Sequence, residues 1–306
     1  MNSAPALPSI TVVIPHLNQP DALARCLAAL AGGTIEPAEV IVVDNGSVRL
    51  PKEIVNDYPW VSLIKQTIPG PGPARNLGAA RAQGAVLAFL DADCQPDPPW
   101  LERAAQRLQR DPDTILGGDV RIACGPGDKL DATTAYQAIF AYRMDHYIAR
   151  QGFTGTGNLI VHRKVFLAVG PFKGLRFAED RDWGQRATAA GHRMAFAPEL
   201  IVHHPPHTAS GLRAKWDRQL AHDWVRCSRH RDKIWWAAKS LLLIASPLGA
   251  VPQIFISARI NGRRNRVMAF IGLASVRLYR AKRMLHLLYG NDPNRLLQRW
   301  NRFDLP

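Results

Sequence analysis

Short apolar runs alternate with helical stretches through the first two-thirds of this sequence, and this alternation constrains the fold more than any other feature. The runs Ile10–Ile14, Val40–Val43 and Val86–Leu90 are rich in β-branched or aromatic side chains, and each ends at Pro or Asp. Such runs are typical of buried parallel strands. Between them, Pro20–Ala31 places leucines on one helical face, and Pro73–Gln83 is rich in alanine. The sequence therefore predicts an α/β domain whose open sheet carries helices on both faces.

Two acidic side chains follow the third predicted strand. Ligands of open α/β sheets bind beyond the carboxyl ends of the strands, so residues there are the first candidates for function. Asp91-Ala92-Asp93 comes directly after Val86–Leu90, and a tight turn would aim both carboxylates into one cleft. Hard cations such as Mg²⁺ and Mn²⁺ prefer carboxylate oxygens and leave positions open for phosphate. The segment predicts a metal–diphosphate site; the alternative is a solvated loop with two unrelated acids.

Two further positions point to a nucleotide. Asp44 follows the strand Val40–Val43 and could bind a ribose or a base edge, although Asp44-Asn45-Gly46-Ser47 could equally form an Asx turn. Arg75 opens a helix after a loop of glycines and prolines, where its guanidinium could hold a phosphate. The alternative for Arg75 is an exposed helix arginine.

Two later segments complete the set of candidates. Gly155-Thr156-Gly157-Asn158 precedes an apolar run, and Glu179-Asp180-Arg181-Asp182 opens a predicted helix. Carboxylates in a first helical turn also compensate the helix dipole, so the acidic segment has an ordinary structural interpretation as well.

The order of these segments resembles the inverting glycosyltransferases of family 2, which have the GT-A (nucleotide-diphospho-sugar transferase) fold. The resemblance covers about residues 9–204 and implies a Rossmann-like mixed sheet flanked by helices. Its motifs here are Pro15-x-x-Asn18, Asp44-Asn45-Gly46-Ser47, Arg75-Asn76-x-Gly78, Asp91-Ala92-Asp93, Gly155-x-Gly157-Asn158 and Glu179-Asp180-x-Asp182.

The resemblance assigns the donor side of the site to one group of residues. Within this group Asp44 is implied to bind the base or ribose, Arg75 to touch the nucleotide, and Asp91 to bind the ribose or donor sugar. The whole group comprises Pro15, Asn18, Asp44, Arg75, Asp91 and Ala92.

The resemblance also implies a divalent cation, Mn²⁺ or Mg²⁺, with Asp93 as its ligand. The family often takes another ligand from a histidine after a late strand. Leu200-Ile201-Val202-His203-His204 offers two, of which His203 is the first choice. We expect His204 and His207 to belong to a polar loop.

Asp180 is implied to be the catalytic base, with Glu179 beside it. The acceptor side of the cleft is implied to include Gly157, Asn158 and Trp183; Trp183 stands where an aliphatic residue is usual. The Q-x-x-R-W signature of processive synthases is absent from the sequence. We therefore expect a single sugar to be transferred with inversion, in the synthesis of cell-envelope glycans or glycolipids. The alternatives are a catalytically silent GT-A scaffold or binding subunit, and a nucleotidyltransferase.

The last third of the chain differs in charge and hydropathy. Residues 201–306 contain 19 Lys/Arg and 5 Asp/Glu, so the whole net charge of +14 belongs to this part. The apolar stretch Ile234–Ser257 is interrupted by Lys239, Pro247 and Pro252, and arginines flank a second apolar patch, Val267–Val276. We expect a catalytic domain over 1–205 and a basic, apolar helical region over 206–306. Residues 234–283 are expected to lie on a membrane as in-plane helices or a broken hairpin; a buried helical subdomain or a dimer interface is the alternative.

Cysteine spacing and the N-terminal sequence bear on the compartment. The four cysteines form no C-x-x-C pair, which argues against a zinc site or a disulfide framework, and the N-terminus lacks the features of a secretory signal. We expect the protein at the cytoplasmic face of the cell membrane, as a peripheral or monotopic protein. The expected partners are a nucleotide-sugar donor, first a UDP-sugar, and a glycan or lipid-linked acceptor. Nucleic acid is not expected, because the basic region shows neither zinc spacing nor an RNP-type aromatic pattern.

Overall fold

The computed structural model describes residues 6–125, 127–175, 178–225, 227 and 229–290 of the chain. The chain divides into two compact units. The described residues of the first fall within Met1–Arg121 and Tyr142–Pro205, and those of the second within Ile122–Ala141 and Pro206–Pro306. The units differ from the expected division into 1–205 and 206–306 in that 122–141 groups with the second unit, because the helix in this segment packs against the helix Arg263–Leu288.

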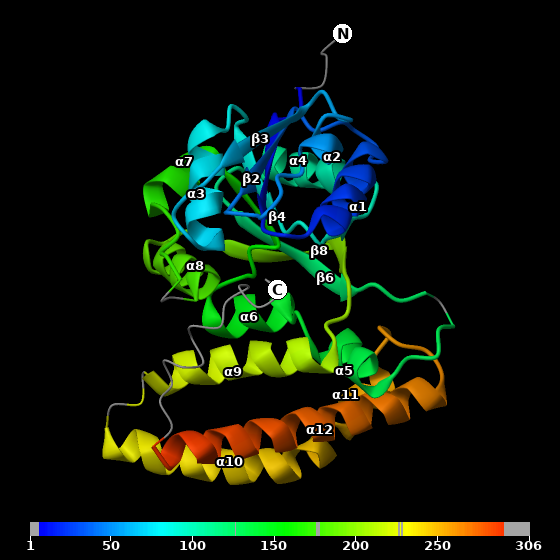
Figure 1. The fold of residues 1–306 in the computed structure, drawn as a ribbon, viewed down its shortest axis with the longest axis vertical. Coiled ribbons are helices and arrows are strands. Elements are labelled where there is room, and N and C mark those ends of the chain that lie inside the picture. Colours follow the sequence, from blue (N-terminus) through cyan, green and yellow to red (C-terminus); the bar gives the residue numbers. More distant parts are fainter. Residues whose placement is uncertain (1–5, 126, 176–177, 226, 228, 291–306) are drawn as a thin grey trace. The chain divides into compact units, whose positions relative to one another are not determined.

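The first unit is built on a sheet with the strand order β3-β2-β1-β4-β7-β6-β8-β5 (Figure 1). β1 pairs in parallel with β2 and β4, and β2 with β3, as expected for the first part of the chain. β7 then pairs antiparallel with both β4 and β6, so the sheet is mixed. The strands are β1 Ile10–His16, β2 Glu39–Asp44, β3 Val61–Lys65, β4 Val86–Leu90, β5 Gln95–Pro96, β6 Ile115–Ile122, β7 Asn158–His162 and β8 Met194–His204.

Helices cover both faces of this sheet, as predicted (Figure 1). Alternate residues of a strand point to opposite faces, so Val12 and Ile14 of β1 pack against α1 and α4, whereas Val13 packs with α3, α7 and α8 on the other face. The helices of this unit are α1 Pro20–Ala31, α2 Lys52–Val55, α3 Pro71–Arg81, α4 Trp100–Arg110, α6 Met144–Gln151, α7 Arg163–Val169 and α8 Glu179–Ala189.

The described part of the second unit is helical. α12 packs along α10 and also against α5, and Gly272 makes the latter contact possible, because a side chain there would collide with the Ala132 carbonyl. Among the described residues, none of the helices combines the length and the hydropathy needed to cross a bilayer. The helices are α5 Ala132–Phe140, α9 Ala209–Val225, α10 His230–Gly249, α11 Val251–Ile256 and α12 Arg263–Leu288.

Candidate active site

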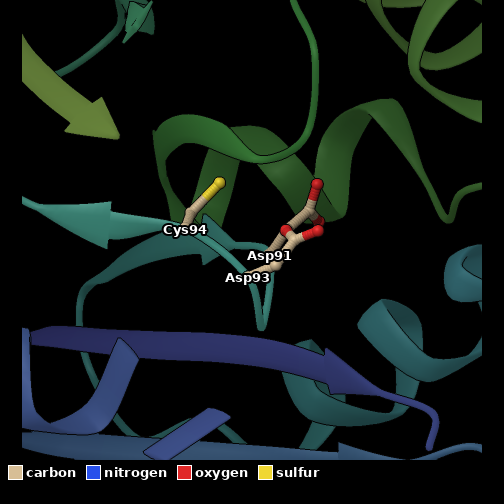
Figure 2. A group of neighbouring side chains, drawn as sticks. All are labelled: Asp91, Asp93 and Cys94. Atoms are coloured by element: carbon tan, nitrogen blue, oxygen red, sulfur yellow. The ribbon is translucent and has the colours of Figure 1, made fainter. Parts of the chain in front are cut away.

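Asp91 and Asp93 lie close together in the turn that follows β4. One carboxylate oxygen of each aspartate and the Cys94 sulfur lie within 4.8 Å of one another, and Figure 2 shows the two carboxylates side by side with the thiol set apart. Burial raises the pKa of the Cys94 thiol well above its usual value, and the charges of Asp91 and Asp93 raise it further. Cys94 therefore stays protonated, and the oxygens of the two aspartates are the donors that a hard cation would use.

The histidine beside Asp93 is His204, not His203. The Nε2 atom of His204 is 3.3 Å from Asp93 Oδ2, whereas the Nε2 of His203 is 2.9 Å from Asp97 Oδ1. Successive residues of β8 point to opposite faces, and His204 shares the buried side with Leu200 and Val202. His204 ends strand β8, so the expectation that it lies in a polar loop is wrong, and the geometry favours His204 over the expected His203 as the ligand beside Asp93.

The Nε2 atom is the ring nitrogen of His204 that lies on the side of Asp93. Nδ1 lies within hydrogen-bond distance of the Pro205 carbonyl oxygen, which can only accept, so Nδ1 is the donor in this hydrogen bond and the bond orients the ring. Nε2 is also 3.1 Å from the hydroxyl of Tyr142, a residue that the sequence analysis missed. Two carboxylates and one imidazole nitrogen form a donor set that Mn²⁺ can accept.

This arrangement predicts different effects for the two neighbouring histidines. His204→Ala should weaken the affinity for Mn²⁺ by at least about tenfold, because it removes a nitrogen donor next to Asp93. His203→Ala is the matched control and should leave the affinity unchanged, since its ring pairs with Asp97. Titration of Mn²⁺ followed by electron paramagnetic resonance measures both. Equal losses in the two variants would contradict the assignment.

Arg75 joins the turn that contains Asp91 and Asp93, here called the aspartate turn, to the start of α8. Its Nη2 donates to Asp91 Oδ1 at 2.6 Å, and its Nη1 donates to Glu179 Oε1 at 3.2 Å. The side chain is only 4% exposed, so Arg75 is not the exposed helix arginine considered as the alternative. Burial alone would lower the pKa of Arg75, but the charges of Asp91 and Glu179 outweigh burial and raise it. Because Arg75 donates to carboxylates of both segments, it holds the Asp91-Ala92-Asp93 motif and the Glu179-Asp180 motif in one site.

Glu179 and Asp180 open α8 in a crowded acidic environment. Burial raises the pKa of both carboxyls, and Arg75 offsets only part of this effect. Asp180 Oδ1 accepts a hydrogen bond from the backbone nitrogen of Arg181, which orients the carboxylate. A carboxylate with a raised pKa is a stronger base than an ordinary aspartate, which suits it for accepting a proton.

Removal of Arg75 should destabilise the fold. Arg75→Met leaves Asp91 and Glu179 without their cation, and breaking a buried pair costs on the order of 3 kcal/mol, less here because Asp91 is 36% exposed. Because the pKa of Glu179 is already raised, its ionisation opposes folding, so the deficit should be larger at about pH 8 than at about pH 5.5, where less of the Glu179 carboxyl is ionised. Urea unfolding at both values measures this. Arg81→Met, an exposed change in the same helix, is the control, and an equal loss there would contradict the prediction.

Asp44 is tied into a network at the ends of β1 and β2. Oδ1 accepts from the backbone nitrogens of Gly46 and Ser47, and Oδ2 is 3.0 Å from Nδ1 of His16, which the sequence analysis missed. Burial would raise the pKa of Asp44, but the hydrogen bonds from His16, Ser47 and Gly46 outweigh it and lower the pKa. The Asx turn considered as an alternative is therefore present.

A cleft of about 590 Å³ opens beside this network, lined by Asp44, Ser47, Lys65, Gln66 and Thr67 among others. Asn18, next in the motif after Pro15, borders the same loop: its side chain accepts a hydrogen bond from the backbone nitrogen of Val48, and its own backbone nitrogen donates to Ser47 Oγ.

Three other candidates, Ala92, Gly157 and Asn158, have structural roles next to the site. Ala92 is buried in the core, and a Cβ on Gly157 would lie 2.6 Å from Asp91 Oδ2, so the glycine leaves room for that carboxylate. Asn158 is fully buried; its Oδ1 accepts from Trp100 Nε1 and its Nδ2 donates to the Leu200 carbonyl. Its side chain stabilises β7 and does not line a cleft.

Trp183 is 1% exposed, and its ring packs against Phe166 and Phe172 in the core. Its Nε1 donates to the carbonyl of Gly170. The side chain is therefore not placed to line an acceptor subsite. Trp183 lies on the inner face of α8 and fills the core. It therefore has the packing role expected of the aliphatic residue that is usual at this position.

Comparison with known proteins identifies relatives of this chain. The family model for glycosyl transferase family 2 matches residues 11–183. The glycosyltransferase AglE of Haloferax volcanii is 35% identical over 207 residues, which cover 65% of this chain and 67% of AglE. The pre-mycofactocin glycosyltransferase of Mycobacterium tuberculosis is 27% identical over 220 residues, 67% of this chain and 44% of that protein.

Solved structures show the same fold. The mannosyltransferase PcManGT of Pyrobaculum calidifontis superposes with a TM-score of 0.59 over 94% of this chain and 89% of its own, at 16% identity. GalNAc-T7 superposes with a TM-score of 0.53 over 66% of this chain and 44% of its own, at 18% identity. These likenesses extend the agreement from sequence motifs to the arrangement of the sheet.

Proposed function

This chain belongs to glycosyl transferase family 2 and is a glycosyltransferase, and we propose that it transfers a single sugar from a nucleoside-diphosphate sugar to an acceptor hydroxyl with inversion. The observation that carries the proposal is the position of Arg75, which contacts Asp91 of one motif and Glu179 of the other. A donor held at the aspartate turn and an acceptor activated at α8 would then share one site.

A divalent cation fits the donor side. When bound by Asp93 and His204, with Asp91 adjacent, it would neutralise the negative charge that builds up on the departing diphosphate. PcManGT was solved with GDP-Man and Mn²⁺, and GalNAc-T7 with UDP, GalNAc and Mn²⁺, which supports both the cation and a nucleotide sugar as ligands here.

Asp180 is the group that we assign to the acceptor. Its carboxylate accepts the proton of the acceptor hydroxyl as the oxygen forms a bond to the anomeric carbon. The bond from that carbon to the diphosphate breaks at the same time, and the diphosphate leaves with the electron pair. Attack from the face opposite the leaving group inverts the anomeric configuration. The raised pKa of Asp180 supports this role, because it makes the carboxylate a better proton acceptor.

The cleft beside Asp44 and the basic charge of the last third of the chain bear on the donor base and the acceptor. The cleft beside Asp44 offers Lys65, Gln66 and Thr67 to the edge of a base, and a UDP-sugar is the first donor to test. We assign the acceptor to the glycans or lipid-linked intermediates of the cell envelope, at the cytoplasmic face of the membrane. The basic charge of residues 201–306 supports a location near anionic lipid.

A panel of UDP-, GDP- and dTDP-sugars, incubated with the full-length protein and Mn²⁺, tests the proposal. We expect one donor to give release of its nucleoside diphosphate, and the product anomer, read by NMR, to be inverted. Release of inorganic diphosphate from a nucleoside triphosphate and a sugar phosphate would instead indicate a nucleotidyltransferase. Donor binding without turnover across a range of acceptors would indicate a silent subunit.

A further inference from the structure

One face of α10 in the second unit is apolar and exposed. Trp235 is 63% exposed and Leu248 is 71% exposed. With their neighbours they recur at intervals of about one or two helical turns, so they share one side of the helix. We call this surface the apolar stripe; it consists of Ile234, Trp235, Leu241, Leu242 and Leu248.

The opposite side of α10 is already packed. Trp236 Nε1 donates to the Met284 carbonyl of α12, and its ring joins a buried cluster with Leu220 and Leu287. Ser240 and Pro247 are buried on the same side. A helix that is apolar around most of its circumference, with only one side packed on protein, has its other side available for an apolar phase.

Exposed apolar side chains are also present in α11. Phe255 and Ile256, at the end of this short helix, are exposed as well, and no charged residue lies between Lys239 and Arg259. Pro252 lies in the first turn of α11, and Pro247 lies inside α10 on its buried side, so both prolines are accommodated within helices. The two helices present an extended run of exposed apolar side chains.

Cations bracket this run, and acids are absent from it. Residues 233–290 contain ten Lys/Arg and no Asp/Glu. Lys233 and Lys239 lie at the beginning of the stripe, and Arg263 and Arg264 come shortly after its end; all four are exposed. A second copy of the chain would bring the same positive charge against this face, whereas an anionic bilayer surface offers the opposite charge and an apolar layer beneath it.

We propose that α10 and α11 lie in the plane of a bilayer containing anionic lipid, with the apolar stripe at the boundary of the acyl chains and the flanking Lys and Arg side chains among the headgroups. The stripe binds the surface without crossing it, which agrees with the lengths and hydropathies of the described helices. The inference uses no property of the candidate active site, so it stands or falls independently of the proposed reaction.

Flotation of the full-length protein tests the inference. We expect it to float with vesicles of equal parts phosphatidylcholine and phosphatidylglycerol, and less with phosphatidylcholine alone or at high salt, which screens the charges. Leu241→Glu combined with Leu248→Glu should lower the partition coefficient by at least about tenfold, because two apolar side chains no longer enter the acyl boundary. Leu167→Glu in α7 changes an equally exposed leucine of the first unit and should bind vesicles as the wild type does.

Fluorescence and oligomeric state make the result decisive. Trp235 emission, isolated as the difference between wild type and Trp235→Phe, should shift to the blue on addition of the mixed vesicles. Circular dichroism checks that the double variant is folded, and release of nucleoside diphosphate in the absence of vesicles should be unchanged in it. Equal flotation of the double variant and the wild type would overturn the inference. So would a wild-type dimer that ignores vesicles and becomes a monomer in the double variant, since the stripe would then be a subunit interface.

Discussion

Replacement of Asp180 by asparagine will reduce turnover by about 10²–10⁴-fold, the contribution typical of a general base, and will at the same time raise the stability of the fold. The rate falls because an amide cannot accept the proton of the acceptor hydroxyl. Asparagine keeps the Oδ1 atom that accepts from the Arg181 backbone, so the local structure is preserved. Measurements of kcat and of thermal unfolding on the same preparation test both effects.

The sign of the stability change follows from the pKa of Asp180. Burial raises this pKa in the folded state, so the folded protein holds the proton more tightly than the unfolded chain. The stabilising contribution is complete below the unfolded pKa of about 3.9 and is lost as pH rises through the folded value. At neutral pH the ionised group opposes folding, and Asp180→Asn removes that opposition. The gain in stability of Asp180→Asn over the wild type should disappear at about pH 4, where Asp180 is protonated in the folded protein.

Asp182, two residues further along α8, provides the matched control. Its carboxylate accepts hydrogen bonds from Lys173 and Arg186. Burial alone would raise the pKa of Asp182, but these hydrogen bonds outweigh burial and lower it. Its contribution is therefore present above the unfolded pKa and lost as pH falls. Asp182→Asn should destabilise the protein and leave kcat within a few-fold. Near wild-type turnover in Asp180→Asn, or comparable losses of turnover in both variants, would remove Asp180 from the role of base.

Replacement of Asp93 by alanine should abolish the stimulation of turnover by Mn²⁺ or Mg²⁺. Asp93 is the carboxylate 3.3 Å from His204 Nε2, so its loss removes an oxygen donor from the group of possible metal ligands formed by Asp91, Asp93 and the neighbouring imidazole. Charge neutralisation at a departing diphosphate is worth several kcal/mol, so we expect a loss of about 10²–10³-fold in kcat at saturating donor. Initial rates measured against the concentration of each cation provide the test.

Asp97→Ala controls for the loss of one negative charge nearby. Asp97 pairs with His203 on the other side of β8, and its replacement should leave the dependence on Mn²⁺ intact. If Asp93→Ala retained the wild-type response to the cation, the aspartate turn would not be the metal site.

Much of the first unit was predictable from the sequence because its signals are local. The apolar runs that became β1, β2 and β4 are too short and too β-branched for helices, and α1 was correct to the residue. The motif residues fell at the ends of these strands, so the position of the aspartate turn followed from the fold class. These features depend on neighbours within a few residues.

The parts that failed depend on long-range contacts. Leu200-Ile201-Val202-His203-His204 has no alternation of polar and apolar residues, so only the pairing of β8 with β5, with His203 opposite Gln95, decides which histidine faces Asp93. Tyr142 stands outside the motifs, and His16 occupies a variable position within Pro15-x-x-Asn18, so the sequence marked neither residue. Arg75 could be placed in the site from the sequence, but not its partners, since Glu179 lies 104 residues away.

The segment 122–141 illustrates the same limit at the level of domains. Its helix α5 reads as an ordinary helix that follows a strand of the first unit, and nothing within the segment indicates that it packs against α12. Gly272, which permits that contact, comes more than a hundred residues later. Pairings of this kind are set by complementary shapes rather than by local propensity.

Anomalous diffraction at the manganese edge, from crystals grown with Mn²⁺ and a nucleoside diphosphate, tests the central claim most directly. The account predicts one strong peak within bonding distance of Asp93 and of His204 Nε2, with the diphosphate on the same ion and Asp180 facing the space beyond it. A peak elsewhere in the molecule, or a diphosphate bound away from the aspartate turn, would contradict it.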